Sequence, residues 1–554
     1  MNTDRRYFRL RFLSLFFIPT IIGGIGLAIT SSDSFVEFRE YVRGKTIPEI
    51  LVKSGRTGKE LRLLEYESLS KFHLEQFEKD LPPSSMPSTR LLFATAERTL
   101  LPTLSIAIDA GDLLDRNSGI IANYSKRGRS WERPAFVSYF ENGDLQFALG
   151  AGVRVHGGKS RAASLKSYRL YFRELYGSPS VPNGHLFRGR GDPIRSLVVH
   201  NDVRTKESDQ MDVRWHFMNP LAYDLARQID CITPSTQPIQ FYLNGIYQGP
   251  YVLTEHISEH FLTAHFGHPN FVFVRMKPNK QGGPFPVERG NPRLFDDLRH
   301  WTQNAPAPLT VDDVNRRVDL LNLTNWIISI LYAGVTDPFQ GAALLDELDP
   351  NARWFWVNWD MDHAFMDLYN QVPNPWEIDN FTGLSGVLQS KKPRSVIFER
   401  LRRESAEYRQ FFLTRITEVL NHILTPEYVA QRIAYYESVA LSYGVPDTKF
   451  LEAMRLFSSE RPAALRRQMD KYFDAGNSYR LTVSSRSPIK FKIDGYDVDD
   501  KYVGWYFEDT EAQIEVEESS LQSTYTWNVN GRPISERGRS LVLSLTNNIN
   551  IEIQ

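Results

Sequence analysis

The chain has 554 residues, and its 65 lysines and arginines against 66 aspartates and glutamates give a formal net charge of −1. Because neither sign dominates, composition does not indicate a nucleic-acid binder or a basic membrane coat. The single cysteine, Cys231, excludes an intramolecular disulfide and a zinc finger. At about 150 residues per domain, the length predicts two to four units.

The amino terminus carries a charge step. Four arginines lie within the first 11 residues, and residues 12–32 contain no charged residue. Such a run can cross a bilayer as one helix, and the arginines predict that this end stays cytoplasmic while the bulk of the chain is exported. A cleaved signal peptide is the alternative. We favour an uncleaved single-pass anchor over residues 1–32 in a bacterial cell membrane, because the run exceeds a typical signal core.

A spacer and then a β-rich region follow. Residues 33–97 have a helical rhythm broken by prolines, which indicates a membrane-proximal spacer. Alternating apolar residues predict one antiparallel β-rich unit over about 98–200. Its turns are predicted at Asn142-Gly143 and at Gly157-Gly158.

Helical periodicity predominates in the second half of the chain. A helix is predicted over residues 211–229, and Asn244-Gly245 marks a hairpin between two strands. After Pro306 the pattern is mainly helical, as far as Phe473. Residues 479–554 read as short strands again and predict a small β-sandwich.

The acidic residues suggest a metal site. Asp337 follows an apolar helical run, and Trp-Asp-Met-Asp at residues 359–362 ends an apolar strand. Asp360 and Asp362 would lie on one side of that strand, because side chains alternate. Paired carboxylates repel unless a cation such as Mg²⁺ or Mn²⁺ lies between them. The alternative is that one aspartate caps a turn and the other is solvated.

A glycine turn and a lysine could complete a phosphoryl-transfer site. Backbone amides in the turn that contains Gly157, Gly158 and Ser160 can approach phosphate oxygens, and Lys166 can neutralise them. The alternative is an ordinary hairpin with a surface lysine. His256 and His260 lack the His-Glu-x-x-His order of a zinc helix, and the chain has no Walker loop.

Five segments of the chain resemble the CotH family of spore-coat-protein-H-like atypical protein kinases, and the resemblance spans about residues 98–475. These segments read GIIANYSKRGRSWERPAFVSYF, GVRVHGGKSRAASLKSYRLYFRELYG, IQFYLNGIYQGPYVLTEHI, GVTD with WFWVNWDMDHAF, and KFLEAMRLFSSERPAALRRQM.

The resemblance implies an α+β, divergent protein-kinase-like domain with a β-rich N-lobe and a helical C-lobe. It also implies binding of ATP with Mg²⁺ or Mn²⁺, and phosphorylation of serine or threonine in an envelope or extracellular protein.

The family motifs assign roles by position. Lys166 matches the nucleotide lysine, and Gly157, Gly158 and Ser160 match the glycine turn. Asp337 matches the catalytic aspartate, and Asp360 matches the metal aspartate, with Asp362 as a second ligand. Glu255 matches the hairpin glutamate, for which a salt bridge to Lys166 is one option.

The chain departs from the family pattern at three positions. Thr336 and Met366 stand where many members have asparagine and glycine, and Gln340 would have to replace an asparagine that holds the second metal. A second hypothesis is therefore an envelope binding protein that keeps the fold with weak or no catalysis. A third is another nucleotide-dependent transfer, such as adenylylation or glutamylation.

Overall fold

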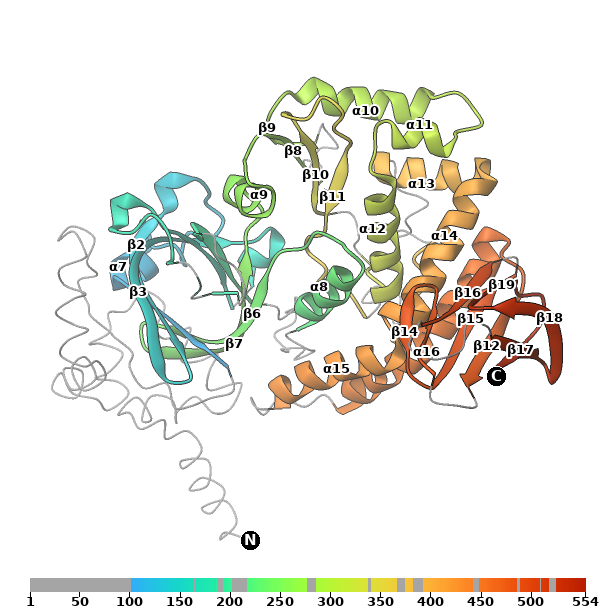
Figure 1. Ribbon diagram of the computed structural model, residues 1–554. Helices are drawn as coiled ribbons and strands as arrows, with labels where there is room; N and C mark the ends of the chain where they lie inside the picture. Colours follow the sequence, from blue (N-terminus) through green and yellow to red (C-terminus); the bar gives the residue numbers. More distant parts are fainter. Residues whose placement is uncertain are drawn as a thin grey trace, which may run out of the picture. The chain divides into compact units, whose positions relative to one another are not determined.

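The computed structural model (Figure 1) describes most of the chain from residue 101 onward. The described range is 101–554 without residues 164, 183, 185, 188–192, 202–216, 277–284, 337–339, 366–373, 382–391, 442–447, 486–488, 509 and 518–524. The predicted anchor (1–32) and spacer (33–97) lie outside this range. Within it, no helix is long and apolar enough to cross a membrane.

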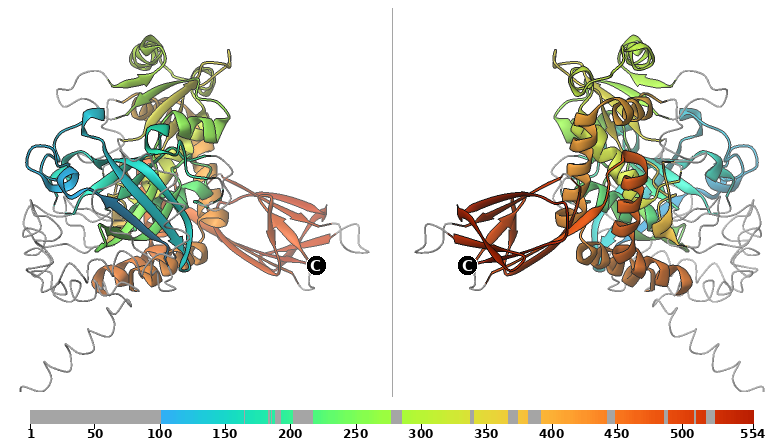
Figure 2. Two further views of the ribbon diagram at one scale, coloured as in Figure 1. Left: turned by 90° about the vertical axis from the view of Figure 1, so that its left-hand side faces the viewer. Right: turned by 90° about the vertical axis from the view of Figure 1, so that its right-hand side faces the viewer.

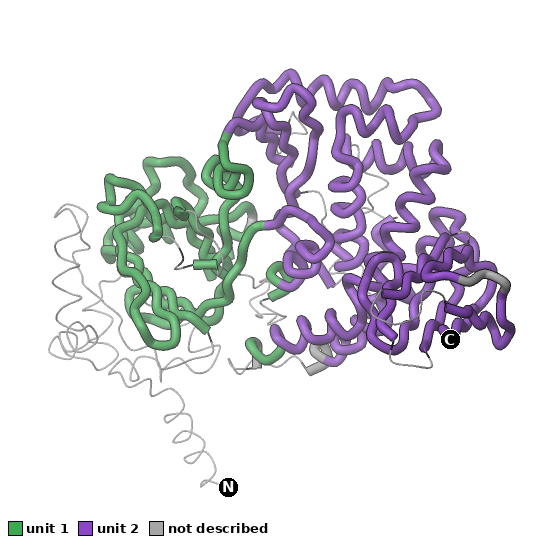
Figure 3. The backbone as a smooth tube through the Cα atoms, in the orientation of Figure 1, with its two compact units in different colours: residues 1–220, 234–269, 437–447 green, residues 221–233, 270–436, 448–554 purple. Residues whose placement is uncertain are grey.

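The chain divides into two compact units, coloured separately in Figure 3. Unit 1 comprises residues 1–220, 234–269 and 437–447, and unit 2 comprises residues 221–233, 270–436 and 448–554. Both sheets and helices are present, so the predicted α+β class is confirmed at that level. The predicted domain boundaries stay predictions.

Unit 1 is built around a closed barrel with the strand order β1-β2-β3-β4-β5-β7-β6. Neighbouring strands are antiparallel except β1 and β6, whose parallel pairing closes the barrel. Closure removes the exposed edges that an open sheet would have. The strands are β1 (Thr103–Ile108), β2 (Arg133–Glu141), β3 (Asp144–His156), β4 (Ser167–Tyr171), β5 (Ser196–His200), β6 (Thr236–Leu243) and β7 (Ile246–Glu255).

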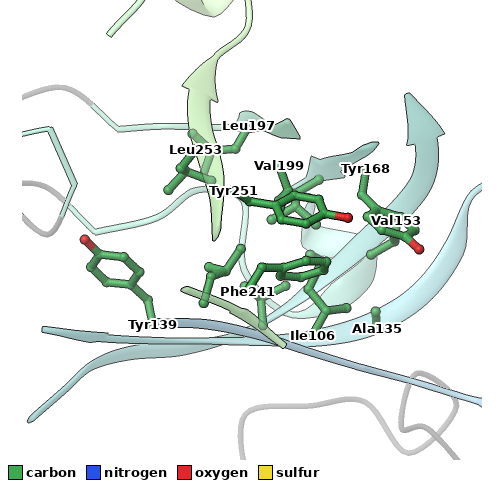
Figure 4. Packing of buried hydrophobic residues seen from close by; sticks show 14 of the residues in the cluster. Ile106, Ala135, Tyr139, Val153, Tyr168, Leu197, Val199, Phe241, Tyr251 and Leu253 are labelled. Atoms are coloured by element: carbon green, nitrogen blue, oxygen red, sulfur yellow. The ribbon is translucent and has the colours of Figure 1, made fainter. Parts of the chain in front are cut away.

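The barrel interior is apolar because alternate residues of each strand point inward. Figure 4 shows the side chains of Phe241 and Tyr251 next to each other there, and their rings pack at a tilt with centroids 4.7 Å apart. Tyr168 packs against Phe241 at 5.7 Å. The sequence predicted two strands where the single long strand β3 lies, and the predicted antiparallel region extends beyond residue 200 through β6 and β7.

The predicted turn at Asn244-Gly245 is confirmed, and it also closes the barrel. Both residues have positive φ, +50° and +74°, as a two-residue hairpin loop requires. The Asn244 side chain accepts from the Ile108 N–H at 2.7 Å and donates to the Ile108 carbonyl at 2.8 Å. One amide therefore joins the β6–β7 turn to the end of β1.

A buried carboxylate, that of Glu132, joins the outer face of β3 to residues that follow β4. The Glu132 side chain is only 1% exposed, and it accepts from Arg154 at 2.9 Å, from Arg173 at 2.9 Å and from the Tyr176 hydroxyl at 3.0 Å. Burial alone would raise the pKa of Glu132, but the hydrogen bonds and charges of the two arginines outweigh it and hold the pKa below the usual 4.5. Gly152 makes room, since a Cβ there would lie 2.5 Å from the carboxylate.

Unit 2 contains most of the helices and a small sheet with the order β11-β10-β8-β9. The sheet consists of β8 (Phe271–Arg275), β9 (Val287–Arg289), β10 (Ala342–Asp346) and β11 (Phe355–Val357). The α-helices of the described residues fall into three groups. Unit 1 contains α7 (Ala110–Leu114) and α9 (Glu259–Phe266), and the unit boundaries cross α8 (Met218–Gln228) and α15 (Pro426–Leu441). Unit 2 contains α10 (Pro292–Asn304), α11 (Val311–Asn315), α12 (Leu320–Ala333), α13 (Pro393–Glu404), α14 (Ala406–Glu418) and α16 (Thr448–Phe473).

Helix α12 is buried on every side. All residues from Leu323 to Ala333 are inaccessible, as expected for a helix that is apolar around its whole circumference. Asp319 caps its start by accepting from the Asn322 N–H at 2.9 Å. The sequence predicted this helix from Trp326 onward.

The end of the chain forms two facing sheets (Figure 2). Their orders are β15-β12-β20-β17-β18 and β14-β13-β16-β19, and side chains from both sheets make one apolar core. The strands are β12 (Ser478–Ser485), β13 (Phe491–Ile493), β14 (Tyr496–Val498), β15 (Lys501–Phe507), β16 (Glu511–Val516), β17 (Tyr525–Val529), β18 (Arg532–Gly538), β19 (Ser540–Ser544) and β20 (Ile549–Ile553).

Replacing Glu132→Gln should lower the free energy of unfolding by roughly 2 to 4 kcal/mol at neutral pH, because two arginines lose their buried counter-charge. The folded-state pKa of Glu132 lies below the unfolded one, so its contribution is present above about pH 4.5 and is lost as the pH falls through the folded value. Denaturant unfolding between pH 3 and 7 measures this. The exposed Glu174→Gln is the control, and equal losses in both variants would contradict the assignment.

Candidate functional site

The glycine turn follows β3 directly. Gly157 has φ +111°, and a Cβ at this position would lie 2.3 Å from the Ser160 Oγ, so the turn requires glycine. Gly158 precedes a short 3₁₀ helix, Lys159–Ala162. From this helix, Arg161 donates to the Gly157 carbonyl at 2.8 Å.

Lys166 lies next to this turn. It directly precedes β4 and is 6% exposed. Its Nζ donates to the Ala163 carbonyl at 2.6 Å and lies 4.4 Å from the centroid of the Tyr124 ring. The Tyr124 carbonyl accepts from Arg161 at 2.9 Å. Tyr124 therefore contacts both Lys166 and the 3₁₀ helix that follows the turn. The structure thus brings Gly157, Gly158, Ser160 and Lys166 together within unit 1.

Glu255 lies elsewhere on the barrel. In the strand register Leu197 pairs with both Glu255 and Leu170, so Glu255 is level with Leu170. Leu170 is four residues beyond Lys166, or about 13 Å along the strand. The buried Glu255 accepts from the Ser235 N–H at 3.2 Å and contacts His265 at 3.3 Å. The register therefore does not favour the salt bridge to Lys166.

Glu255 also borders a small hollow beside α9, whose wall includes Arg195, His256 and His260. Burial and the charge of Arg195 lower the pKa of His260. Among the residues that the structure describes, no group of three or more His, Cys, Asp or Glu side chains is arranged to hold a metal. Asp337 is not part of that set.

The segment before Asp337 lies against the segment after Asp362. Helix α12 ends at Ala333 and is capped by Gly334, which has φ +59°. Beyond it the Thr336 N–H donates to the His363 carbonyl at 3.1 Å, and the Phe365 N–H donates to the Ala333 carbonyl at 2.7 Å. Asp337 itself lies outside the described residues. The two aspartate motifs, 22 or more residues apart in sequence, are nevertheless joined through their described neighbours.

The chain that follows residues 337–339 contacts β11 and α13. Gln340 and Gly341 lead into β10, whose Ala342 pairs with Val357. Gly341 has φ +113°, and a Cβ there would lie 2.4 Å from the Val357 carbonyl. The Gln340 carbonyl accepts from the buried Arg394 at 3.2 Å. A metal-binding role for the Gln340 side chain stays a prediction.

Asp360 is not part of a strand. Strand β11 ends at Val357, and Asp360 has the left-handed φ of +61°, so strand alternation does not set its direction relative to Asp362. The backbone N–H of Asp360 donates to the hydroxyl of Tyr223 on α8 at 2.8 Å. Tyr223 is only 2% exposed. The sequence analysis missed this residue, because nothing in the local sequence connects α8 with residue 360.

Asn358 is a second residue that the sequence analysis missed. Its Nδ2 donates to the Ser329 Oγ at 3.0 Å, while its Oδ1 is buried and has no hydrogen-bond partner. Asn358 stands two residues before Asp360 in the sequence, so its amide oxygen is a further candidate oxygen donor in this segment. Oxygen donors are the ligands that Mg²⁺ and Mn²⁺ prefer, so the residues present fit such an ion.

The chain belongs to the CotH kinase family. The family model described as CotH kinase protein matches residues 153–449, more than half of the chain, and confirms the resemblance. No curated protein matches. One similar solved structure is the toxin–antitoxin HipA, HipB and operator DNA complex of Shewanella oneidensis MR-1, with 12% identity over 80% of this chain and 85% of that chain and a TM-score of 0.28. A TM-score this low supports no conclusion about the fold of this chain.

Gly157→Ala should destabilise the protein more than Gly249→Ala does. Both glycines have nearly the same φ, +111° and +108°, so both variants incur the cost of a left-handed alanine, about 1 to 2 kcal/mol. Only the Cβ at residue 157 meets another atom, the Ser160 Oγ, whereas space is open at residue 249. Chemical unfolding gives the difference, and equal free energies of unfolding would refute the close packing of the turn.

Tyr223→Phe should weaken Mn²⁺ binding about tenfold, since the Asp360 N–H loses its acceptor and the aspartate loses its fixed backbone. Electron paramagnetic resonance of free Mn²⁺ measures the affinity. The control is Tyr408→Phe, which removes another buried hydroxyl of unit 2, one that contacts Thr324 at 3.2 Å. Equal Mn²⁺ affinities in the two variants would argue against the role of Tyr223.

Proposed function

We propose that this chain is an ATP- and divalent-metal-dependent protein kinase of the CotH family, which phosphorylates serine or threonine of an envelope or extracellular protein. Family membership supports the activity class. The observation that carries the proposal is the hydrogen bond between Thr336 and His363, which joins the neighbours of the catalytic and metal aspartates. A barrel with Lys166 and a mainly helical unit with the aspartates fit a kinase-like pair of lobes.

Each residue has a defined role in this proposal. Lys166 and the turn at Gly157 neutralise and contact the phosphates of ATP. Asp360, with Asp362 and the Asn358 Oδ1, would supply oxygen ligands for Mg²⁺ or Mn²⁺, and the charge of a bound ion would stabilise a phosphoryl group in transfer. Asp337 orients the acceptor hydroxyl. This division follows the general need of phosphoryl transfer for positioning and charge stabilisation.

The proposal extends to the location of the enzyme. The charge step at residues 1–32 supports a single-pass anchor in the bacterial cell membrane, with the bulk of the chain on the extracytoplasmic side. The protein substrate would then be an envelope or surface protein.

A second candidate is an envelope binding protein with weak or no catalysis. The observation in its favour is Gln340, which stands where many family members have the asparagine for a second metal. Loss of one such contact lowers a rate by about 10² to 10³. Adenylylation or glutamylation on the same fold would use the same nucleotide site.

Asp360→Asn should abolish metal-dependent ATP binding, because the substitution removes the charge that holds the cation. Titration calorimetry with ATP and Mn²⁺ or Mg²⁺ tests this on the wild type and the variant, with the exposed Asp312→Asn as the control. Incorporation of radiolabelled γ-phosphate then distinguishes phosphorylation from transfer of the nucleotide. Absence of ATP binding by the wild type with either metal would refute the kinase and favour the binding protein.

A further inference from the structure

Arg461, on α16, is completely buried and donates only to backbone carbonyls. Its Nε donates to the Tyr332 carbonyl at 3.1 Å, and its Nη2 donates to that of Leu331. Its Nη1 donates to the carbonyls of Trp376 and Ile378 at 2.5 and 2.9 Å. One guanidinium therefore ties the last turn of α12 to the segment around the 3₁₀ helix Pro375–Glu377.

A buried cation with only neutral hydrogen-bond partners is costly, so its position calls for a reason. Burial lowers the pKa of Arg461 to about 10, which leaves the guanidinium protonated at neutral pH. Two contributions favour the charge: the C-terminus of α12, where helix carbonyls carry partial negative charge, and the nearby carboxylates of Asp379 and Glu377. An apolar residue at position 461 would leave the carbonyls of Leu331 and Tyr332 without this donor.

The contacts of Arg461 belong to a set that holds the chain before Asp337. The Ala333 carbonyl accepts from the Phe365 N–H at 2.7 Å, and the Val335 carbonyl accepts from the Asn380 Nδ2 at 2.7 Å. The carbonyls of residues 331, 332, 333 and 335 thus all accept from distant parts of the chain. Arg461 supplies two of these four contacts and is the one charged donor among them.

We propose that Arg461 is a positioning residue: its guanidinium fixes the exit of α12 and thereby sets where residues 334–336, which lead to the catalytic Asp337, lie against residues 363–365. This inference rests on the proposed function for the role of Asp337. Arg461 contacts neither Lys166 nor Asp360 through its recorded hydrogen bonds, so nucleotide binding and the placement of Asp337 become separable.

The test compares Arg461→Lys with Arg466→Lys in the full-length protein. Arg466 is on the same helix, but its guanidinium lies 4.9 Å from the Trp505 ring centroid, away from α12. Hydrogen exchange with mass spectrometry follows the amides of Gly334, Val335 and Thr336, which report local opening of this segment. We expect Arg461→Lys to speed their exchange about tenfold or more, with exchange in β12 to β20 unchanged, and Arg466→Lys to leave them at wild-type rates.

A second measurement separates positioning from general stability. ATP turnover with Mn²⁺ should fall about tenfold or more in Arg461→Lys, while the Kd for ATP with Mn²⁺ should stay within about threefold of wild type. Wild-type exchange at Gly334–Thr336 in Arg461→Lys, or acceleration spread evenly over unit 2, would overturn the inference. A wild type without ATP binding would refute the proposed function, while exchange would still decide whether Arg461 orders the segment.

A further variant keeps the test decisive if Arg461→Lys does not fold. Asn380→Ala removes the donor to the Val335 carbonyl without creating or removing a buried charge. The same set of contacts then predicts faster exchange at Val335 and Thr336. Unchanged exchange in Asn380→Ala would contradict the inference that these contacts hold the segment in place.

Discussion

Burial of α12 is the constraint on which most of unit 2 depends. Because the helix is buried on all sides from Leu323 to Ala333, its polar side chains need hydrogen-bond partners. Asn322 bonds both the N–H and the carbonyl of Trp356 in β11, and Ser329 accepts from Asn358. Asn325 accepts from Arg415 of α14. The polar groups of this one helix thus place β11, the approach to Asp360 and α14.

Buried charge organises both units, in different ways. In unit 1 the carboxylate of Glu132 is compensated by two arginines, Arg154 and Arg173, and the pairing joins strands to each other. In unit 2 Arg461 donates to carbonyls, with the charges of Asp379 and Glu377 nearby. Arg394 lies 3.8 Å from the Trp326 ring centroid and donates to the Gln340 carbonyl. Both arginines contact backbone that flanks residues 337–339. Because these arginines bind backbone carbonyls, they fix the course of the main chain and do not depend on which side chains it carries.

Local signals in the sequence predicted local structure well. The hairpin at Asn244-Gly245 is present, because it depends on residues within one turn. The alternation argument for Asp360 and Asp362 was wrong. It assumed that the apolar strand continues to residue 362, whereas β11 has only three residues and Asp360 is left-handed. The two-residue alternation of a strand does not predict side-chain directions for residues that follow the end of the strand.

The sequence alone determined the α+β class, the family and the identity of the candidate site residues, since periodicity, turn residues and motif order are properties of neighbouring positions. Only the tertiary structure decided that Thr336 meets His363, that Tyr223 holds the backbone of Asp360, and that Arg461 holds the end of α12. These contacts join residues 27 to 137 positions apart. Such pairs form because buried donors and acceptors must be satisfied, and which distant groups meet is set by the packing of whole elements.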